Sequence, residues 1–333
     1  MTAILGLDTS MYTTSAALAD MRRFVFGHKR VMLDVAAGER GLRQSEALYM
    51  HIKSIGGVID GLMEQCGRPD IIAVCASVRP RPKSGSYMPV FRAGEAVGRS
   101  IASALGVPFI ETSHQEGHII AAAKGLADRD WMAFHLSGGT SELVKACIRG
   151  GLVSDIEIAG RTLDISAGQL VDRAGVAMGL PFPSGTGLEK LAEKASDNEL
   201  RLPSFVKGLD FSFSGAENEV MKLIKCGKRS EAAYAVYACI SATLAKLIAN
   251  ALEMGMPREF LLGGGVACSA LLRRMLINRL QKRRIEARLF FAEPEFCSDN
   301  AVGVALIGAA EMARRGEDNI HRAKDGFYDS EDN

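Results

Sequence analysis

Two histidines with helical spacing are the first residues whose types suggest chemistry. They are His114 and His118, in the stretch SHQEGHII at residues 113–120. On a helix, side chains at positions i and i+4 lie on one face, so the two imidazoles could bind the same metal ion. The alternative is a pair of ordinary histidines on a half-buried helix face. The pair directly follows a strand-like segment, and this arrangement favours a metal site.

A third ligand is needed to complete such a site, and the best candidate is Asp299 in the motif CSDN. Asp299 could also cap the last helix, and the two roles can coexist. The order H-x-E-x-H differs from the H-E-x-x-H of metallopeptidases. Glu116 lies two residues from each histidine, about 200° around a helix, and therefore points away from their metal. This geometry argues against a peptidase.

Turns built from small residues are the second chemical feature, because glycines let backbone N–H groups approach a phosphate closely. The motif SGGTS occupies residues 137–141, and GGGVA occupies residues 263–267, before a helix whose N-terminus could also bind phosphate. Each could equally be an ordinary tight turn. The sequence has neither GxxxxGKS nor GxxxxGKT, which excludes a standard P-loop.

Asp8 ends an apolar, strand-like segment and begins the turn motif DTSMYTT. Its carboxylate could hold a metal-bound water, with magnesium as the candidate ion, close to a phosphate. It could instead cap the turn that follows it. The residues alone leave both roles open.

Two similar strand pairs are expected to position these turns. Alternating segments flank the turn after Asp8, at residues 2–20, and the SGGTS turn, at residues 131–150, which indicates an internal duplication. Apolar spacing predicts helices at residues 45–67, 93–106, 270–284 and 297–315, and strands at residues 70–78, 107–113 and 260–263. We therefore expect an α/β protein with two domains.

The composition suits that expectation, since 333 residues with 47% hydrophobic side chains can bury two cores. A net charge of +1 predicts no global field for nucleic acid or membranes. The seven cysteines are scattered without a CxxC motif, which argues against a disulfide framework and suits the cytoplasm. The N-terminus lacks signal-peptide features and no segment has 18 uninterrupted apolar residues, so we expect no membrane span.

The motifs together resemble the TsaD/Gcp family, in order and spacing, over nearly the whole chain. The resemblance implies two ribonuclease-H-like domains of the actin/sugar-kinase/heat-shock-chaperone (ASKHA) type, with a nucleotide cleft between them. We expect the first domain at residues 1–125 plus 300–325, and the second, with a helical insertion, at residues 126–299. The matching segments are LGLDTS, HQEGH, LSGGTSELV, GQLVDRAGVAMGLPFPSGTGLEKLA, LDFSFSGAENEV, LLGGGVACSALLRR and CSDNAVGVALIGAAE.

The resemblance also implies an activity, the transfer of a threonylcarbamoyl group from threonylcarbamoyl-adenylate to N6 of adenosine 37 in tRNA. His114, His118 and Asp299 match the family's metal ligands, usually to iron or zinc, and with Asp8 they form the expected catalytic group. The metal would polarise the carbamoyl-adenylate as the tRNA amine attacks and AMP leaves. The expected adenine-nucleotide positions are Ser137, Gly138, Gly139 and Thr140 near the phosphates, Asp172, Gly185 and Glu189 near the ribose and adenine, and Gly264, Gly265 and Ser269 in a second loop.

Several positions depart from the family pattern. Asp8 stands where the family has a glutamate, Thr140 where it has a histidine, and Ser269 where it has a nucleotide-contacting asparagine. The departures leave two alternatives open. One is a small-molecule carbamoyltransferase or phosphotransferase that uses the same cleft, and the other is a noncatalytic scaffold of the same tRNA-modification machinery.

The family resemblance, and not the composition, indicates which partners this protein would have. It implies a TsaB-like paralogue and a TsaE-like ATPase, or a homodimer formed through the first domain. Two basic stretches could contact tRNA, although a solvated surface is the alternative because no aromatic residues interleave them. These stretches contain Arg79, Arg81, Lys83 and Arg92 in one loop region, and Arg273, Arg274, Arg279, Lys282, Arg283 and Arg284 in one helix.

Overall fold

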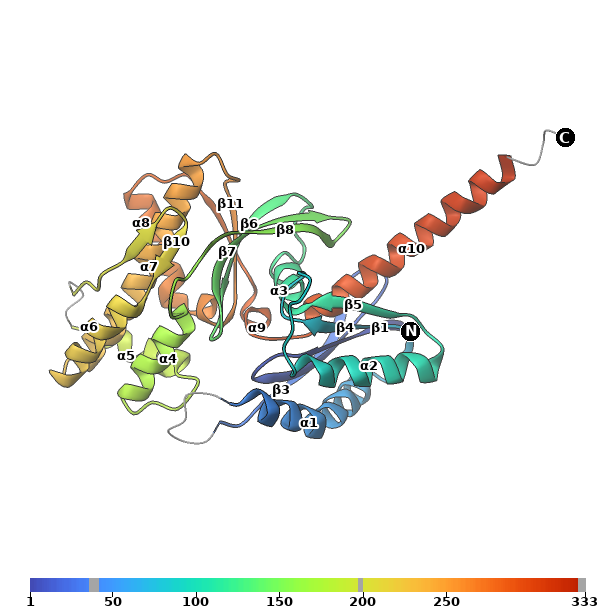
Figure 1. Ribbon diagram of the computed structural model, residues 1–333, viewed down its shortest axis with the longest axis horizontal. Helices are drawn as coiled ribbons and strands as arrows, with labels where there is room; N and C mark the ends of the chain where they lie inside the picture. The colour runs from blue at the N-terminus through green and yellow to red at the C-terminus, as the bar shows by residue number, and fades with distance from the viewer. Residues whose placement is uncertain (36–41, 197–199, 329–333) are drawn as a thin grey trace.

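The computed structural model describes residues 1–35, 42–196 and 200–328, with side chains described as far as residue 316. Its strands form two five-stranded sheets, in the orders β3-β2-β1-β4-β5 and β12-β11-β6-β7-β8, and a small sheet of β9 and β10. Figure 1 shows the two large sheets side by side, with α10 projecting away from the first. The chain is therefore a mixed α/β protein, as its alternating patterns predict.

The first sheet begins with three antiparallel strands, β1 (Thr2–Thr9), β2 (Thr13–Ala19) and β3 (Val25–Met32). The strands β4 (Asp70–Arg79) and β5 (Phe109–Ser113) then add in parallel beside β1. Strand β1 is apolar on both faces because both are covered, as is usual for central strands of α/β sheets.

Alternate residues of β1 enter two different cores. Leu5 and Leu7 pack with α1 (Gln44–Gln65) and α2 (Phe91–Leu105), whereas Ile4 packs with α3 (His114–Ala122) and α10 (Val302–Tyr328). Consecutive strand side chains point to opposite faces, so this division follows directly from the strand geometry. Helices α3 and α10 thus lie on the face of the sheet opposite α1 and α2.

The second sheet repeats the hairpin with β6 (Asp130–Leu136) and β7 (Ser141–Arg149), followed by β8 (Leu152–Arg161). Strands β11 (Glu259–Gly263) and β12 (Arg288–Phe291) continue in parallel on the other side of β6. Met132 and Phe134 face a large helical core, whereas Trp131 and Ala133 face the core that contains α3 and α10. The two sheets therefore share the core built around α3 and α10.

The remaining elements cover the outer face of the second sheet or connect its strands. Helix α7 (Arg229–Glu253) is long and apolar enough to span a membrane, but 78% of its most apolar 18-residue stretch is buried in the protein, as in a core helix. These elements are α4 (Ala167–Ala177), α5 (Gly185–Ala192), β9 (Phe205–Lys207), β10 (Asp210–Ser212), α6 (Ser214–Lys225), α7 (Arg229–Glu253), the 3₁₀ helix η1 (Gly265–Cys268), α8 (Ala270–Lys282) and α9 (Pro294–Cys297).

Both predicted strand pairs are confirmed, and so are the predicted helices at α1, α2 and α8. The helix predicted from residue 297 begins later, at Val302, because Asn300 Oδ1 accepts the Val302 N–H at 2.9 Å and caps α10. The strand β11 and the helix α8 are also separated by η1. The domain boundaries at residues 125 and 299 stay predictions.

Glycines allow the two central helices to approach closely. A Cβ atom on Gly303 of α10 would lie 1.8 Å from the carbonyl oxygen of Gly117 in α3, which no real structure tolerates. The two backbones can meet because Gly303 lacks a side chain, whereas a Cβ on Gly117 would press only on the Val304 side chain, at 3.1 Å. This contact places the start of α10, and the loop before it, beside the histidine-bearing face of α3.

Candidate metal and nucleotide site

Helix α3 starts with a capping box that fixes the direction of its side chains. Ser113 Oγ accepts the Glu116 N–H at 3.2 Å, and Glu116 Oε2 accepts the Ser113 N–H at 2.8 Å. Glu116 is thus occupied at the helix start and does not face the histidines. The predicted helix with His114 and His118 on one face is confirmed, and so is the orientation that argues against a peptidase.

Donor atoms from two distant segments converge at these histidines. The Nε2 atoms of His114 and His118 are 3.0 Å apart, and Asp299 Oδ1 lies 3.1 Å from His118 Nε2 and 3.5 Å from His114 Nε2. Ligands on bonds of about 2.0 Å in a tetrahedral site stand about 3.3 Å apart. The three predicted ligands therefore have the separations that one transition-metal ion requires.

The loop before α10 carries Asp299 to the two histidines of α3. Ser10 Oγ donates to Asp299 Oδ2 at 2.8 Å, which leaves Oδ1 directed at α3. Arg30 of β3 supports the same loop through the carbonyl oxygens of Glu295, at 3.4 Å, and Asp299, at 3.5 Å. Since Asn300 caps α10, Asp299 is not needed as a helix cap and its carboxylate is free for a ligand role.

Asp8 supports the site from β1 and does not cap its turn. Its side chain is fully buried, and Oδ1 accepts hydrogen bonds from Ser77 and from His114 Nδ1, the latter at 2.9 Å. A proton held on Nδ1 leaves the Nε2 lone pair for a metal, which is the usual carboxylate–histidine–metal arrangement. Asp8 Oδ2 is also buried and has no hydrogen-bond partner among the described residues.

The carboxylates control the charge of this cluster. Burial alone would lower the pKa of His114, but the charges and hydrogen bonds of Asp8 and Asp299 raise this pKa to about 10. Burial would raise the pKa of Asp299, but its bonds to His114 and His118 hold this pKa well below the usual range. A proton therefore stabilises the cluster when no metal is bound, and the two compete for the same atoms.

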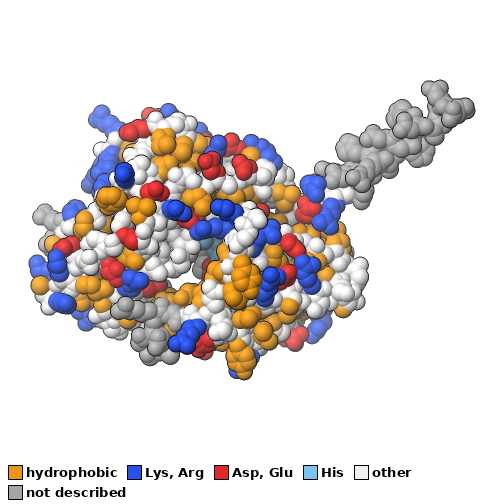
Figure 2. Space-filling view, in the orientation of Figure 1, with side chains coloured by type: hydrophobic (Ala, Val, Ile, Leu, Met, Phe, Trp, Pro, Cys, Tyr) orange, Lys and Arg blue, Asp and Glu red, His pale blue; other side chains and the backbone are white. Residues whose placement is uncertain are grey.

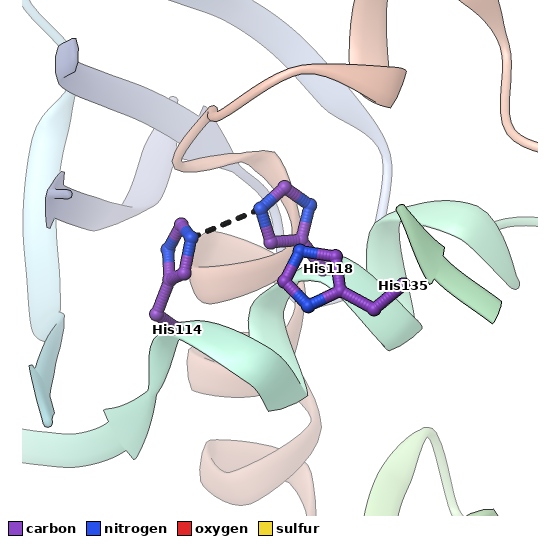
Figure 3. Close-up of side chains that lie close together, drawn as sticks. All are labelled: His114, His118 and His135. Carbon is purple, nitrogen blue, oxygen red and sulfur yellow. Dashed lines mark hydrogen bonds between the residues drawn. The ribbon is translucent and has the colours of Figure 1, made fainter. Parts of the chain in front are cut away.

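His135 is a fourth candidate donor, and the third histidine, which the sequence did not predict. Its ring lies 4.6 Å from that of His118 and 6.3 Å from that of His114, between centroids, and one nitrogen from each of the three rings fits within 4.8 Å (Figure 3). Its Nε2 is buried and finds no partner in the described part of the chain. Burial, followed by the neighbouring histidines, holds the pKa of His135 well below its usual value, so the ring stays neutral.

A signal for His135 did exist in the sequence. In the alternating strand β6, His135 shares a face with Trp131 and Ala133, and it precedes the SGGTS turn by two residues. The alternation could not show that this face meets α3, because strand periodicity says nothing about which helix covers which face. Only the packing of the two sheets around α3 revealed it.

The SGGTS turn is closed by its own hydrogen bonds and leaves its glycines open. Ser137 N–H donates to the Thr140 carbonyl at 2.8 Å, and Thr140 N–H donates to Ser137 Oγ at 3.1 Å. Helix α4 packs beneath the turn, where a Cβ on Gly168 would lie 2.5 Å from the Ser137 carbonyl oxygen. Gly138 and Gly139 are exposed on the other side, where an anion could approach their backbone.

Asp172 and Gly185 lie beside this turn, as the sequence analysis expects. The Asp172 carboxylate would be 4.0 Å from a Cβ on Gly138, and it accepts the Ser184 N–H at 2.8 Å. Ser184 precedes α5, which begins at Gly185. Burial raises the pKa of Asp172, partly offset by the bond from Ser184, so this carboxylate is a semi-buried polar group able to accept a hydroxyl hydrogen bond.

The second glycine loop, at residues 263–267, packs against the end of β6 through Gly264. This residue has φ +92, and a Cβ there would lie 2.4 Å from the Leu136 carbonyl oxygen, so only glycine fits between η1 and the end of β6. Gly265 is open to solvent. The two nucleotide loops predicted from the sequence therefore lie side by side, and Figure 2 shows a hollow in this face of the molecule with histidine atoms inside it.

The start of α8 differs from the expected phosphate-binding helix end. Glu189 Oε1 accepts the Leu271 N–H at 2.8 Å, and Ser269 Oγ accepts the Leu272 N–H at 3.1 Å. These N–H groups are therefore already occupied by side chains. Glu189 and Ser269 organise the second loop through these caps, and a phosphate at this loop would meet the backbone around Gly265 instead of the end of α8.

The basic stretches proposed for tRNA are less free than their sequence suggests. Arg79, Arg81 and Arg92 each pair with a glutamate. In α8, Arg273 and Arg279 turn inwards to the backbone carbonyls of Ala267 and Ala238. The glutamates offset the charges of Arg79, Arg81 and Arg92, whereas Lys282, Arg283 and Arg284 at the end of α8 are exposed.

This chain is similar to known proteins in sequence and in fold. The family model TsaD, tRNA N6-adenosine threonylcarbamoyltransferase, matches residues 34–306. Component A of (R)-2-hydroxyglutaryl-CoA dehydratase from Acidaminococcus fermentans is 13% identical, with a TM-score of 0.58 over 94% of this chain and 100% of that chain. HypF from T. kodakarensis is 13% identical, with a TM-score of 0.59 over 94% of this chain and 48% of that chain.

A ROK family glucokinase from Streptomyces griseus is also similar, at 14% identity and a TM-score of 0.52 over 94% of this chain and 99% of that chain. At such identities these likenesses show the fold alone, and they confirm the expected ASKHA type. The family match is of another kind, since it spans most of the chain and includes the histidine pair, both glycine loops and Asp299. This protein therefore belongs to the tRNA N6-adenosine threonylcarbamoyltransferase family.

Proposed function

We propose that this protein transfers a threonylcarbamoyl group from threonylcarbamoyl-adenylate to N6 of adenosine 37 in tRNA. One observation carries the proposal: the donors of His114, His118 and Asp299 converge at 3.0, 3.1 and 3.5 Å. His135 of β6, whose ring lies 4.6 Å from that of His118, stands two residues before the SGGTS turn. A metal beside a nucleotide-binding turn can polarise the carbonyl group of a bound acyl-adenylate. Family membership supports the same class of reaction.

A divalent metal would be held by Nε2 of His114, Nε2 of His118 and Oδ1 of Asp299. When bound, it supplies Lewis-acid chemistry that stabilises negative charge on the carbonyl oxygen during attack. His135 offers a fourth protein donor from β6.

The adenylate would lie with its phosphate at the exposed backbone of Gly138 and Gly139 and its ribose beside Asp172. The tRNA amine attacks the carbamoyl carbon, a new N–C bond forms, and the bond from that carbon to the phosphate oxygen breaks. AMP leaves with the bonding electron pair, and the proton lost by N6 passes to the departing phosphate or to solvent. Asp8 contributes by keeping the proton of His114 on Nδ1 throughout.

The departures from the family pattern predict a weaker site with the same chemistry. Ser269 Oγ accepts the Leu272 N–H in the cap of α8, and its single hydroxyl cannot reproduce both polar groups of the expected asparagine amide. Losing one hydrogen bond typically costs about 0.5–1.5 kcal/mol, or roughly threefold to tenfold in affinity. We therefore expect adenine nucleotides to bind, with reduced affinity.

A protein partner is part of the proposal. Helix α1 exposes Tyr49 and Ile52, at 62% and 59% of their surface, and the neighbouring strand β3 exposes Met32. Exposed aromatic and aliphatic groups on adjoining elements are typical of protein interfaces. They support docking of a TsaB-like paralogue, or of a second copy, on the first sheet's α1 side, with a TsaE-like ATPase as a further component.

The test supplies threonylcarbamoyl-adenylate, unmodified tRNA and the partner proteins, and detects the modified nucleoside by mass spectrometry. A standard family member serves as the positive control, and the His118→Ala variant as the negative one. We expect the wild-type protein to form the product and the variant to form none. If the positive control works and the metal-loaded protein forms no product, the small-molecule transferase or the scaffold becomes the better explanation.

A further inference from the structure

Two cysteines that lie far apart in sequence meet between the candidate nucleotide and metal segments. Cys268 is the last residue of η1, and Cys297 is the last residue of α9, two residues before Asp299. Cys268 packs against the small apolar cluster that contains Cys297, and η1 contacts α9. The sequence has no CxxC motif, so this dithiol exists only in the folded chain.

The surroundings hold both sulfur atoms in place. Cys268 Sγ donates to the Pro294 carbonyl at 3.7 Å, and Cys297 Sγ donates to the Ala292 carbonyl at 3.4 Å. Arg273 contacts both Cys297 and the carbonyl group that accepts from it, since its Nη2 lies 3.3 Å from Cys297 Sγ and 2.9 Å from the Ala292 oxygen. Both thiols are thus anchored to residues 292–294, at the start of α9 and just before it.

The two cysteines of this pair differ in their exposure to solvent. Cys268 is half-buried, whereas Cys297 is fully buried. An oxidant can therefore reach Cys268 from solvent, and Cys297 is then the nearest group able to displace it. This is the arrangement of an attacked cysteine and a resolving cysteine.

We propose that Cys268 and Cys297 form a reversible disulfide that responds to small-molecule disulfides such as oxidised glutathione. Cys268 sulfur bonds to one glutathione sulfur and the glutathione disulfide breaks, releasing one reduced glutathione. Cys297 sulfur then bonds to Cys268 sulfur and releases the second glutathione. Two protein thiols are oxidised, one glutathione disulfide is reduced, and the two thiol protons leave on the two glutathione molecules.

The bond would connect the glycine loop to the segment that carries Asp299. Both thiols would stop donating to the carbonyls of Pro294 and Ala292, so η1 and α9 would have to shift together. Gly265 precedes Cys268 in η1, and Asp299 follows Cys297. We therefore expect oxidation to weaken nucleotide binding, and this consequence rests on the nucleotide site of the proposed function.

The cross-link is tested on the full-length protein, reduced and then exposed to oxidised glutathione. After alkylation of free thiols and tryptic digestion, mass spectrometry should find residues 259–273 joined to residues 289–314, two hydrogens lighter than the separate peptides. The Cys297→Ser variant should retain glutathione on Cys268, and Cys226→Ser, which changes an exposed cysteine elsewhere, should form the link normally. Glutathione on Cys226 with Cys268 and Cys297 both free would overturn the proposal.

A second measurement separates this inference from the proposed function. Calorimetry with ADP should show at least threefold weaker binding to the oxidised wild-type protein, reversed by a reductant, and no such change in Cys297→Ser. Unchanged affinity in a fully cross-linked protein would refute the coupling. If neither form bound ADP, the proposed nucleotide site would fail, while the peptide result would still decide whether the disulfide forms.

Discussion

The two hairpins of the molecule, β1–β2 and β6–β7, approach the same pair of histidines and contribute different chemistry. In each, a buried polar residue stands two positions before a turn serine: Asp8 before Ser10, and His135 before Ser137. Asp8 bonds to His114 Nδ1 at 2.9 Å, whereas the His135 ring lies 4.6 Å from that of His118. The first hairpin therefore orients a ligand through charge, and the second adds a neutral donor.

The turns of the hairpins differ in the same way. Ser10 is buried and donates its hydroxyl hydrogen bond to Asp299, so the first turn supports the candidate metal site. The second turn bonds within itself and exposes Gly138 and Gly139, so it remains open to an anion. Under the proposed function, a duplicated strand pair thus serves one site from two sides, with one copy closed around the candidate metal ligands and the other open to an anion.

The largest expected effect comes from removing the histidine that contacts both Asp299 and the His135 ring. His118→Ala should lower metal affinity by more than the roughly tenfold to hundredfold typical of supporting residues. Elemental analysis and chelator competition on tag-free protein would measure it. Glu116→Gln is the matched control, since Glu116 caps α3 and glutamine can do the same, and its metal content should equal that of the wild type.

The contrast between the hairpins is tested by comparing Asp8→Asn with His135→Gln. The first change removes the charge that orients His114, and we expect metal affinity to fall by roughly tenfold to hundredfold. The second removes a supplementary donor, and a loss of about tenfold, near the lower limit, is expected. Equal affinity in His135→Gln and the wild type would mean that the second hairpin serves only the nucleotide.

The open turn can be tested without disturbing the fold. A Cβ on Gly138 would meet only Asp172, at 4.0 Å, so Gly138→Val should fold normally and obstruct only an incoming phosphate. We expect ADP affinity to fall by about tenfold, consistent with the loss of one or two charge-assisted hydrogen bonds. Calorimetry measures it, and thermal unfolding should match the wild type. Unaltered ADP binding would place the nucleotide elsewhere.

A further effect concerns pH and the metal-free protein. The folded-state pKa of His114, about 10, lies above that of an unfolded histidine, about 6.5. Its stabilising contribution is therefore complete below about pH 6.5 and is lost as the pH rises through about 10, by at most about tenfold in the folding equilibrium per pH unit. Urea unfolding after chelation should show this decline, and Asp8→Asn should flatten it. A metal-free protein that gains stability over this range would contradict the assignment.

Local features of the site could be predicted from the sequence because they depend on neighbouring residues. The spacing of His114 and His118 is a helical property, and the capping box that directs Glu116 away from them involves Ser113, three residues earlier. The turns at residues 137–140 and 263–265 follow from glycine's backbone freedom, and the two hairpins follow from alternation. These features, with the family motifs, were enough to predict the fold class.

Other features depended on contacts between residues far apart in the chain. Asp299 reaches α3 because Gly303 lets two helices touch, and His135 reaches the cluster because β6 turns that face towards α3. Periodicity shows that a strand has two faces, but which helix covers each face is decided when the sheets pack. The sequence by itself determined the ligands on one helix and the open turns, whereas only the tertiary structure decided which donors meet them, because those distances are set by packing across the whole chain.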